Sequence, residues 1–398
     1  MDDEEGDFTK VLMIYMMTNL SRGRLLQLMI RYPKQMGLDD GNYYKDGEYY
    51  VPGRIYIDSC LECPNPQRMK DNIGIYPVTF YYILDALHVG FENMRNSDVS
   101  HKEMIAIFLN ITICGGGFRG AANLFQRSKS TVHNSFHIIA KLIFAYLYDV
   151  HVVWPAVNCE RHPILMDNRY SPFGNCVGGG DGTYIKLIVP SSISGRMRCR
   201  KGYTCMNVFA VANFNCEFIF VQAGGDGAEH DATILRYIEQ KNQWPLIGNQ
   251  TILLDAAYGN SSHKFTPYRS VRYHLREWRH ADNRPNSAME LYNLRHSKLQ
   301  SQAIECAFGI LKEKFRIFQQ PLEFQRPMIQ MMVIYDLFCL HNIILQYEGK
   351  PTHINDVENI DADNFIHDLD MNTISGNDLR DEVAGEMWYN YQLYLNHS

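Results

Sequence analysis

The spacing of apolar residues divides the chain into a helical region and a mixed region. From Ser100 to about Tyr148, apolar residues recur at helical spacing in the runs MIAIFLNITI and STVHNSFHIIAKLIFAYL. This spacing is typical of helices that bury one face. A GGG break ends the first run, and the short turn RSK then joins RGAANLFQ to the second. The pattern therefore predicts two consecutive helices connected by a tight turn.

Two helices joined in this way suggest a helix-turn-helix. Ser130 is the expected N-cap of the second helix. The first turn of that helix would expose Thr131, His133 and Asn134, whose side chains can contact phosphates or base edges in a DNA groove. A three-helix bundle that only supports the next domain would show the same pattern. The sequence leaves both interpretations open.

From about residue 165 the pattern changes to strands alternating with helices. The runs TYIKLIV, MNVFAVANF and FIFVQAG have the spacing of consecutive antiparallel strands, and a helix in HDATILRYI precedes a fourth strand, TILLDAAYG. A later long helix closes this series. The order predicts an RNase H-like α/β fold, in which a mixed sheet is flanked by helices, with an N-terminal helical, helix-turn-helix-like domain before it.

The expected organisation has four parts. Residues 1–99 carry no recognisable chemistry, and residues 100–150 form the helical domain. Residues 165–347 form the α/β domain, and residues 348–398 are expected to be an acidic, mobile tail. The last segment, WYNYQLYLNH, could be a helix that docks on the body or a partner-binding segment.

Three acidic residues stand at the ends of apolar or helical runs. Asp181 lies in the first strand, Asp255 at the end of the fourth, and Glu305 on the closing helix. In the predicted fold they would converge, which is unfavourable for like charges unless a cation binds between them. Oxygen ligands suit Mg²⁺ or Mn²⁺. Two such ions about 3.5 to 4 Å apart can activate the attacking oxygen and stabilise the leaving oxygen of a phosphodiester.

Each acid also has a simpler explanation. Asp181 could begin a turn, Asp255 could cap a helix starting at Ala256, and Glu305 could be solvated. Glu305, however, is adjacent to the apolar stripe of its helix instead of opposite to it. The stripe consists of Ile304, Phe308, Leu311 and Phe315. Together with the strand order, this position favours a shared metal site.

Asp231, in GGDGAEHDATIL, is a fourth acid close to this predicted site. It is expected to N-cap the helix ATILRYI. A role as a metal ligand at the second position is left open.

The net charge of −6 means that any contact with DNA must come from local basic clusters. One cluster comprises Arg196, Arg198, Arg200 and Lys201, and a second comprises Arg269, Arg272, Arg276 and Arg279. Both suit contacts with phosphates, although a solvated hairpin and a solvated helix face would look the same.

Two further cations precede Glu305 on the closing helix. Arg295 and Lys298 share a helix face with Glu305 by their spacing, so either could neutralise a phosphate near the metal ions.

Cysteine usage and hydropathy bear on the compartment. The ten cysteines are scattered, the chain opens with the acidic segment MDDEEGDF, and no apolar run is expected to reach the roughly 20 residues that span a bilayer. We therefore expect a reducing compartment and no membrane role. Cys60 and Cys63 have the spacing of zinc ligands, but no second pair follows to complete a tetrahedral site.

Several ordered motifs resemble the PIF/Harbinger superfamily of DDE transposases and the Harbinger transposase-derived nucleases. The resemblance extends from about His101 to Leu345 and is carried by STV, DGTYI, RKGY, GGDGAEHDATIL, LLDAAYG, LYNLRHSKLQ, IECAFGILKEKFRIF and LHNIIL. It implies a nuclear, divalent-metal nuclease or strand transferase with Asp181, Asp255 and Glu305 as its triad. It also implies a separate Myb-like DNA-binding partner. The sequence departs from the family at SKLQSQAIEC, where more arginine is usual, and at the GGG before Asp181.

Two other functions are compatible with this fold. A domesticated, catalytically silent DNA-binding or adaptor protein would keep the fold without the activity. A hydrolase of small phosphate esters would share the metal chemistry, but the basic flanks favour a large polyanionic substrate.

Overall fold

A computed structural model describes most of the chain. The described residues are 53–92, 94, 97–241, 243–245, 247–273, 284–324, 326–351 and 376–397. Residues 1–52 and the acidic stretch at 352–375 lie outside them, so the expectations for these segments are not addressed by the structure.

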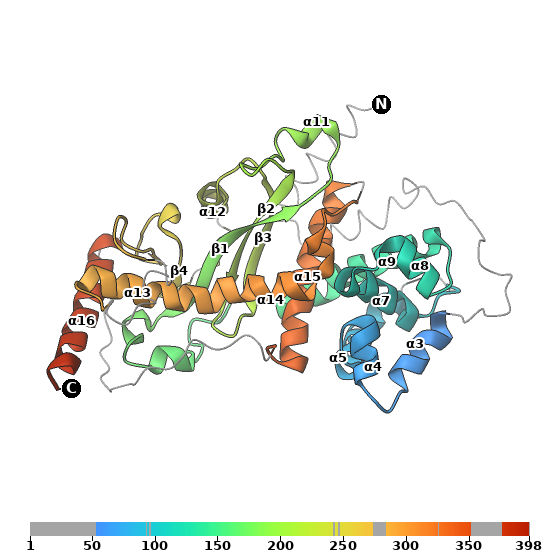
Figure 1. Cartoon of the computed structure of the whole chain (residues 1–398), viewed down its shortest axis with the longest axis horizontal. Coiled ribbons are helices and arrows are strands. Elements are labelled where there is room, and N and C mark those ends of the chain that lie inside the picture. The colour runs from blue at the N-terminus through green and yellow to red at the C-terminus, as the bar shows by residue number, and fades with distance from the viewer. Residues whose placement is uncertain are drawn as a thin grey trace.

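A five-stranded mixed sheet forms the centre of the α/β part (Figure 1). Its strands are β1 (Cys176–Lys186), β2 (Cys205–Ala212), β3 (Phe218–Asp226), β4 (Thr251–Leu253) and β5 (Lys264–Phe265). The order across the sheet is β3-β2-β1-β4-β5. The first three strands are antiparallel neighbours, whereas β4 runs parallel to both β1 and β5.

Helices cover both faces of this sheet. On one face lies α12 (Asp231–Gln240); on the other lie α13 (Ala288–Gln300), α14 (Cys306–Lys314) and α15 (Pro327–Glu348). All eight residues of β2 are buried, because alternate side chains enter the apolar clusters on the two faces. The predicted RNase H-like arrangement, a mixed sheet flanked by helices, is confirmed.

The N-terminal part is helical from Gly53 onward. Its elements are α3 (Gly53–Leu61), α4 (Gln67–Ile73), α5 (Pro77–Ala86), α6 (His88–Glu92), α7 (His101–Leu109), η2 (Asn110–Cys114), α8 (Gly117–Leu124), α9 (Lys129–Leu142), η3 (Ile143–Leu147) and α10 (Tyr148–His151). The helical region thus begins earlier than residue 100. Cys60, one of the two cysteines with zinc-ligand spacing, is buried in its apolar core.

The helices α8 and α9 are consecutive and joined by a short turn, as the sequence predicts. The N-cap of α9 is Ser128, not Ser130: the Ser128 Oγ accepts a hydrogen bond of 3.1 Å from the backbone N–H of Thr131. Ser128 has the extended backbone that an N-cap requires, whereas Ser130 already lies inside the first helical turn.

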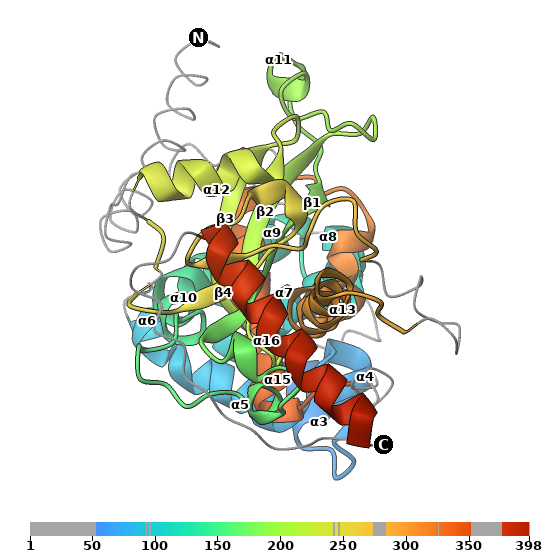
Figure 2. The ribbon, with the colours of Figure 1, turned by 90° about the vertical axis from the view of Figure 1, so that its left-hand side faces the viewer.

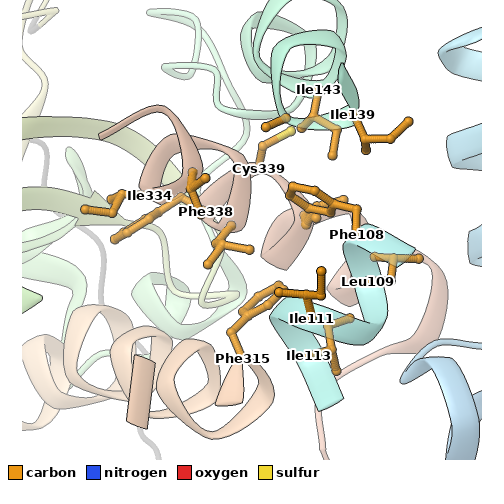
Figure 3. Packing of buried hydrophobic residues seen from close by; sticks show 14 of the residues in the cluster. Phe108, Leu109, Ile111, Ile113, Ile139, Ile143, Phe315, Ile334, Phe338 and Cys339 are labelled. Atoms are coloured by element: carbon orange, nitrogen blue, oxygen red, sulfur yellow. The ribbon is translucent and has the colours of Figure 1, made fainter. Parts of the chain in front are cut away.

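One apolar core joins the helical part to the sheet. Figure 3 shows buried side chains of α7, η2, α9, η3 and α15 gathered together, among them Phe108, Ile139 and Phe338. Phe315, which follows α14, belongs to the same cluster. The helical region and the α/β region therefore share their interior, and α15 lies between them.

α15 corrects one expectation about apolar runs. Its 22 residues are long and apolar enough, by length and composition, to cross a membrane. However, 94% of its most apolar 18-residue stretch is buried inside the protein. A helix that lies between two layers contacts protein on all sides, so apolar residues are expected around its whole surface.

The C-terminal helix α16 (Gly376–His397) docks on the body. It packs against α13, with Leu379, Val383 and Met387 buried in the interface (Figure 2). The last segment, residues 388–397, continues this helix: Trp388 and Tyr391 pack against the body, whereas Tyr389, Leu393, Tyr394 and Leu395 are exposed, so docking and partner binding both stay predictions for it. Residues 376–397 are an ordered helix and not part of an acidic tail, because their apolar side chains cover the end of the sheet near β5.

A side chain of α15, Asn342, binds backbone groups at the start of the edge strand β3. Asn342 accepts a hydrogen bond of 2.8 Å from the backbone N–H of Phe218. Its amide nitrogen donates to the carbonyls of Phe218, at 2.8 Å, and His151, at 2.7 Å. Asn342 thus satisfies buried backbone groups on an edge strand and on the end of α10.

We predict that Asn342→Ala lowers the free energy of unfolding by about 2 to 4 kcal/mol, because three buried backbone groups lose their partner. Gln346→Ala, at an exposed position one turn further along the same helix, should change it by less than about 0.5 kcal/mol. Urea unfolding followed by circular dichroism measures both. Equal effects of the two substitutions would contradict the role assigned to Asn342.

Candidate active site

Asp181 and Asp255 come from neighbouring parallel strands. Gly179 of β1 pairs with Leu253 of β4, and two residues further along each chain this register brings Asp181 beside Asp255. Adjacent strands lie about 4.8 Å apart, so the two carboxylates lie at the same end of these two central strands. Asp255 precedes a short 3-10 turn at Ala256–Tyr258, but its side chain makes no capping hydrogen bond.

The closing helix consists of α13, the π-helical turn at Ser301–Glu305 and α14 in succession. It crosses β1 next to Asp181. A Cβ atom on Gly179 would lie 3.4 Å from the Cβ of Ala303 and 3.6 Å from the Cα of Gln300. These are ordinary van der Waals distances, so an alanine would fit at Gly179, whereas a longer side chain would meet the helix. Of the three glycines before Asp181, Gly179 faces this helix, whereas a Cβ on Gly178 would lie 2.1 Å from the carbonyl oxygen of Ala212 and one on Gly180 would lie 2.8 Å from Leu254.

Glu305 ends a π-helical turn, η8 (Ser301–Glu305), between α13 and α14. The apolar stripe predicted around it is buried, while Glu305 itself is exposed. One carboxylate oxygen accepts a hydrogen bond of 2.9 Å from the Ser301 hydroxyl. The carboxylate is therefore turned back along its own helix.

The three acids act on one another electrostatically. Burial, followed by the charge of Asp255, raises the pKa of Asp181 to about 7, and the charges of Asp231 and Glu305 act in the same direction. The backbone N–H of Gly182, which donates to Asp181 Oδ1 at 2.7 Å, opposes this shift. Asp181 is thus the centre of an acidic cluster whose full ionisation needs a compensating positive charge.

Two tyrosines border the acids. The Tyr258 hydroxyl donates to Asp181 Oδ1 at 3.5 Å, and the Tyr273 hydroxyl donates to Gln300 at 2.8 Å. Burial and the neighbouring carboxylates raise the pKa of both phenols. Both hydroxyls therefore keep their protons at neutral pH and serve as hydrogen-bond donors.

The donor chemistry of these acids fits a divalent cation. In the part of the chain that the structure describes, no three His, Cys, Asp or Glu side chains stand together as a finished metal cage. The Glu305 carboxylate is bound to the Ser301 hydroxyl, while its charge still acts on Asp181. Carboxylate oxygens alone favour Mg²⁺ or Mn²⁺ over zinc.

Asp231 lies on the other side of β1. It is the first residue of α12, whose N-cap position is His230, so the expected N-cap role of Asp231 is wrong. Its carboxylate instead accepts a hydrogen bond of 2.6 Å from the Asn207 amide. A Cβ atom on Gly182 would lie 2.4 Å from its carboxyl carbon, so glycine is required there. Asp231 adds negative potential from the α12 side.

Arg295 and Lys298 do not share a face with Glu305. Arg295 is buried, and its neighbours are Tyr170, Arg169 and Asp167. Burial lowers the pKa of Arg295 to about 10. Burial, then Arg169 and Arg295, also lowers the pKa of Lys298.

The π-helical turn explains this error. One extra residue in a helical turn rotates everything beyond it by about 100° relative to the residues before it. Spacing counted with an ordinary helical period therefore fails between Lys298 and Glu305.

The first basic cluster forms a hairpin at the end of β1 and β2. Met197 and Cys199 are buried, whereas Arg198, Arg200 and Lys201 alternate with them or follow them and are exposed. Arg196, in contrast, makes a two-bond ion pair with Asp226, at 2.9 and 3.0 Å. Three cations of this cluster are thus directed to solvent.

Lys312 is a residue that sequence analysis missed. Its ammonium donates to the Thr183 hydroxyl at 2.5 Å, two residues beyond Asp181 on the same face of β1. Partial burial and the nearby charge of Lys201 lower its pKa, and Asp181 opposes that shift. Lys312 thus connects the basic hairpin to the acids. The available signal was its position two helical turns after Glu305.

The second basic cluster has mainly structural partners. Arg272 bonds the Glu290 carboxylate at 3.1 Å, and Arg269 donates to the carbonyl of Ala256 at 2.7 Å. Arg276 and Arg279 lie outside the described residues.

On α9, the three residues expected to face DNA differ in exposure, and Asn134 is half-buried. Thr131 is half-buried, and its hydroxyl contacts the Ser128 hydroxyl at 2.8 Å. His133 is exposed, and its Nε2 lies 3.0 Å from Nε2 of His137. Of the three, His133 is the one directed toward solvent.

Comparison with known proteins gives two family matches. Residues 180–342 match the family described as DDE superfamily endonuclease. Residues 50–145, which include α3 to α9, match a domain of unknown function. No curated protein and no solved structure matches the chain significantly. The first match contains all three acids and supports a transposase-type, metal-dependent nuclease domain, for which DNA is the implied substrate.

The raised pKa of Asp181 has a measurable effect on stability. The unfolded carboxyl ionises near pH 4, and the folded one near pH 7. The folded state therefore binds more protons in this window, and stability is lost as pH rises through it. We predict that Asp181→Asn raises the metal-free free energy of unfolding at pH 8 by about 2 to 4 kcal/mol, and by less at pH 5.

Urea unfolding in the presence of a chelator tests this prediction. Asp167→Asn is the matched control, because hydrogen bonds from Arg169 lower the pKa of Asp167 despite its partial burial. That substitution should destabilise the protein. A lower free energy of unfolding for Asp181→Asn than for the wild-type protein at pH 8 would contradict the repulsion assigned to Asp181.

Proposed function

We propose that the protein is a Harbinger-type DNA endonuclease or transposase that cleaves phosphodiester bonds with two Mg²⁺ or Mn²⁺ ions held by Asp181, Asp255 and Glu305. The observation that supports this most is that Asp181 and Asp255 follow paired positions of two neighbouring strands inside the segment that matches the DDE superfamily endonuclease family. Burial, and then the charges of Asp255, Asp231 and Glu305, raise the pKa of Asp181. Like charges around a largely buried carboxylate such as Asp181 destabilise the folded state, and cation binding would remove this cost.

The residues of the chain would divide the work as follows. Asp181 and Asp255 would hold the shared cation site, and Glu305 would join them if its carboxylate left the Ser301 hydroxyl. The ions, when bound, would supply activation of an attacking water or 3′-hydroxyl and stabilisation of the leaving oxygen. The protonated Tyr258 hydroxyl donates a hydrogen bond to Asp181 and so orients that carboxylate. Asp231 acts from behind β1 as a source of negative potential, with direct ligation left as a further possibility to test.

DNA would enter over the basic hairpin. Arg198, Arg200 and Lys201 are directed to solvent, and Lys312 continues the positive surface to the acids. Contacts of this kind bind the backbone without reading sequence. Arg196 would reach a phosphate only by giving up Asp226.

A second contact, through Thr131 and His133 at the start of α9, belongs to the same proposal. The proposal also includes a nuclear location and a separate Myb-like partner protein that recognises the DNA sequence.

A catalytically silent DNA-binding or adaptor protein is the alternative. It would keep the basic hairpin but would have no reason to keep acids that repel one another. Metal binding therefore separates the two functions.

We predict cleavage of a labelled DNA duplex with Mg²⁺ or Mn²⁺ by the wild-type protein. Asp181→Asn and Glu305→Gln should each lower the rate at least about a hundredfold, because each removes a ligand of the ions. Glu313→Gln, an exposed acid on the same helix as Glu305, should leave the rate within about threefold.

Metal binding is measured separately from cleavage. Mn²⁺ should raise the melting temperature of the wild-type protein by mass action, and this shift should vanish in Asp181→Asn. A protein whose melting temperature does not respond to Mn²⁺, and that does not cut DNA, would be the silent alternative.

We also predict that Arg198→Ala combined with Arg200→Ala weakens binding to duplex DNA and lowers the slope of log K against log salt by about 2, the number of phosphate contacts removed. The control is Arg54→Ala with Arg68→Ala, two exposed arginines on α3 and α4. Fluorescence anisotropy over a salt series measures both variants. An equal loss in the control would mean that binding depends only on total charge.

A further inference from the structure

Two cysteine side chains far apart in the sequence touch beside Glu305. The sulfur atoms of Cys216 and Cys306 lie 3.0 Å apart, although 90 positions separate them in the chain. This contact is closer than two sulfur atoms reach by simple packing. None of the steps proposed for cleavage uses either thiol.

Cys216 is held rigidly in the turn between β2 and β3. Its backbone N–H donates to the carbonyl of Asn213 at 3.0 Å, and its carbonyl accepts a hydrogen bond of 2.8 Å from His341 Nε2. Its φ of 64° is a left-handed conformation that side-chain-bearing residues seldom adopt. The turn therefore directs this one thiol toward the closing helix.

Cys306 follows Glu305 directly and begins α14. The Cys216 thiol also reaches the carbonyl of Gln302, at 3.3 Å, inside the π-helical turn. Cys216 is fully buried, whereas Cys306 is partly exposed. A small oxidant would reach Cys306 first, and Cys216 is the thiol in position to respond.

We propose that Cys216 and Cys306 form a reversible disulfide that fixes the π-helical turn before Glu305. With hydrogen peroxide as oxidant, the Cys306 sulfur takes one oxygen and becomes a sulfenic acid, and one water is released. The Cys216 sulfur then attacks that sulfur, the S–S bond forms, and the hydroxyl leaves as a second water with the Cys216 proton. A dithiol reductant restores both thiols by exchange.

This modification goes beyond the proposed nuclease function and does not depend on it. In a reducing compartment the disulfide would be transient, so it would report oxidising conditions. The bond would close a long loop of the chain, and constraints of that kind stabilise the folded state mainly by restricting the unfolded chain. Its local effect is to tie the turn that carries Glu305 to the sheet.

The test treats the full-length protein with hydrogen peroxide, blocks remaining thiols, and maps disulfides by mass spectrometry of peptides. We expect the Cys216–Cys306 cross-link as the main intramolecular product, removed by a dithiol. Oxidation should also raise the melting temperature by at least about 3 °C. It should slow hydrogen exchange in the peptide that contains residues 301–306.

Two variants complete the design. Cys306→Ser changes the partly exposed member, so it preserves the buried turn, and it should abolish the cross-link and both physical effects. Cys159→Ser removes an exposed thiol elsewhere and should keep all three. Oxidation that stops at a modified Cys306, or a cross-link that forms without slower exchange at 301–306, would overturn the proposal. Because no readout uses DNA cleavage, a protein without nuclease activity would still give a clear answer.

Discussion

The close approach of the closing helix to β1 is the constraint on which the site depends. At Gly179 the strand and the helix are separated by little more than one methyl group, which would contact Ala303 and the backbone at Gln300. This contact fixes the height of the helix above the sheet and therefore the position of Glu305 relative to Asp181. The parallel register of β1 and β4 adds Asp255 at the same end of these two strands. Three segments distant in sequence thus meet through backbone packing and not through any attraction between the acids.

Several buried polar side chains away from the acids pair with the backbone. Gln330 donates to the carbonyls of Ile188, at 2.7 Å, and Phe324, at 3.0 Å. Asn293 accepts a hydrogen bond of 2.8 Å from the backbone N–H of Tyr268. Buried polar groups are normally paired in this way. Around Asp181 the neighbours include carboxylates of the same sign, and such a destabilising arrangement is typical of functional sites.

Much of the fold could be predicted from sequence because it follows from short-range patterns. Alternating apolar residues marked the strands in the correct order, and the stripe around Phe308 and Leu311 marked the buried face of the closing helix. Asp181 and Asp255 were found because each follows or interrupts an apolar run. Local pattern also indicated the turn before α9, although Ser128 and not Ser130 caps it.

The remaining features depend on information that local spacing does not contain. A π-helical turn looks like any other helical sequence, so the rotation that separates Arg295 from Glu305 was not visible. The all-round burial of α15 reflects a position between two layers, which is a tertiary property. Ion pairs cannot be predicted from local spacing either. The sequence predicts DNA contacts for Arg196 and Arg272, but in the structure each has a carboxylate partner.

Because Arg196 and Arg272 already pair with carboxylates, the positive charge available to DNA lies mainly at the other cations of the basic hairpin and at Lys312. A protein with a net charge of −6 attracts DNA only where positive charges lie close together and lack acidic partners at contact distance. Lys312 matters here because it brings a cation to the face of β1 that carries Asp181, where Lys201 is a neighbour. A phosphate bound between such cations and an acidic cluster is pulled toward the cluster only if cations occupy it. The same geometry would therefore couple productive DNA placement to metal occupancy.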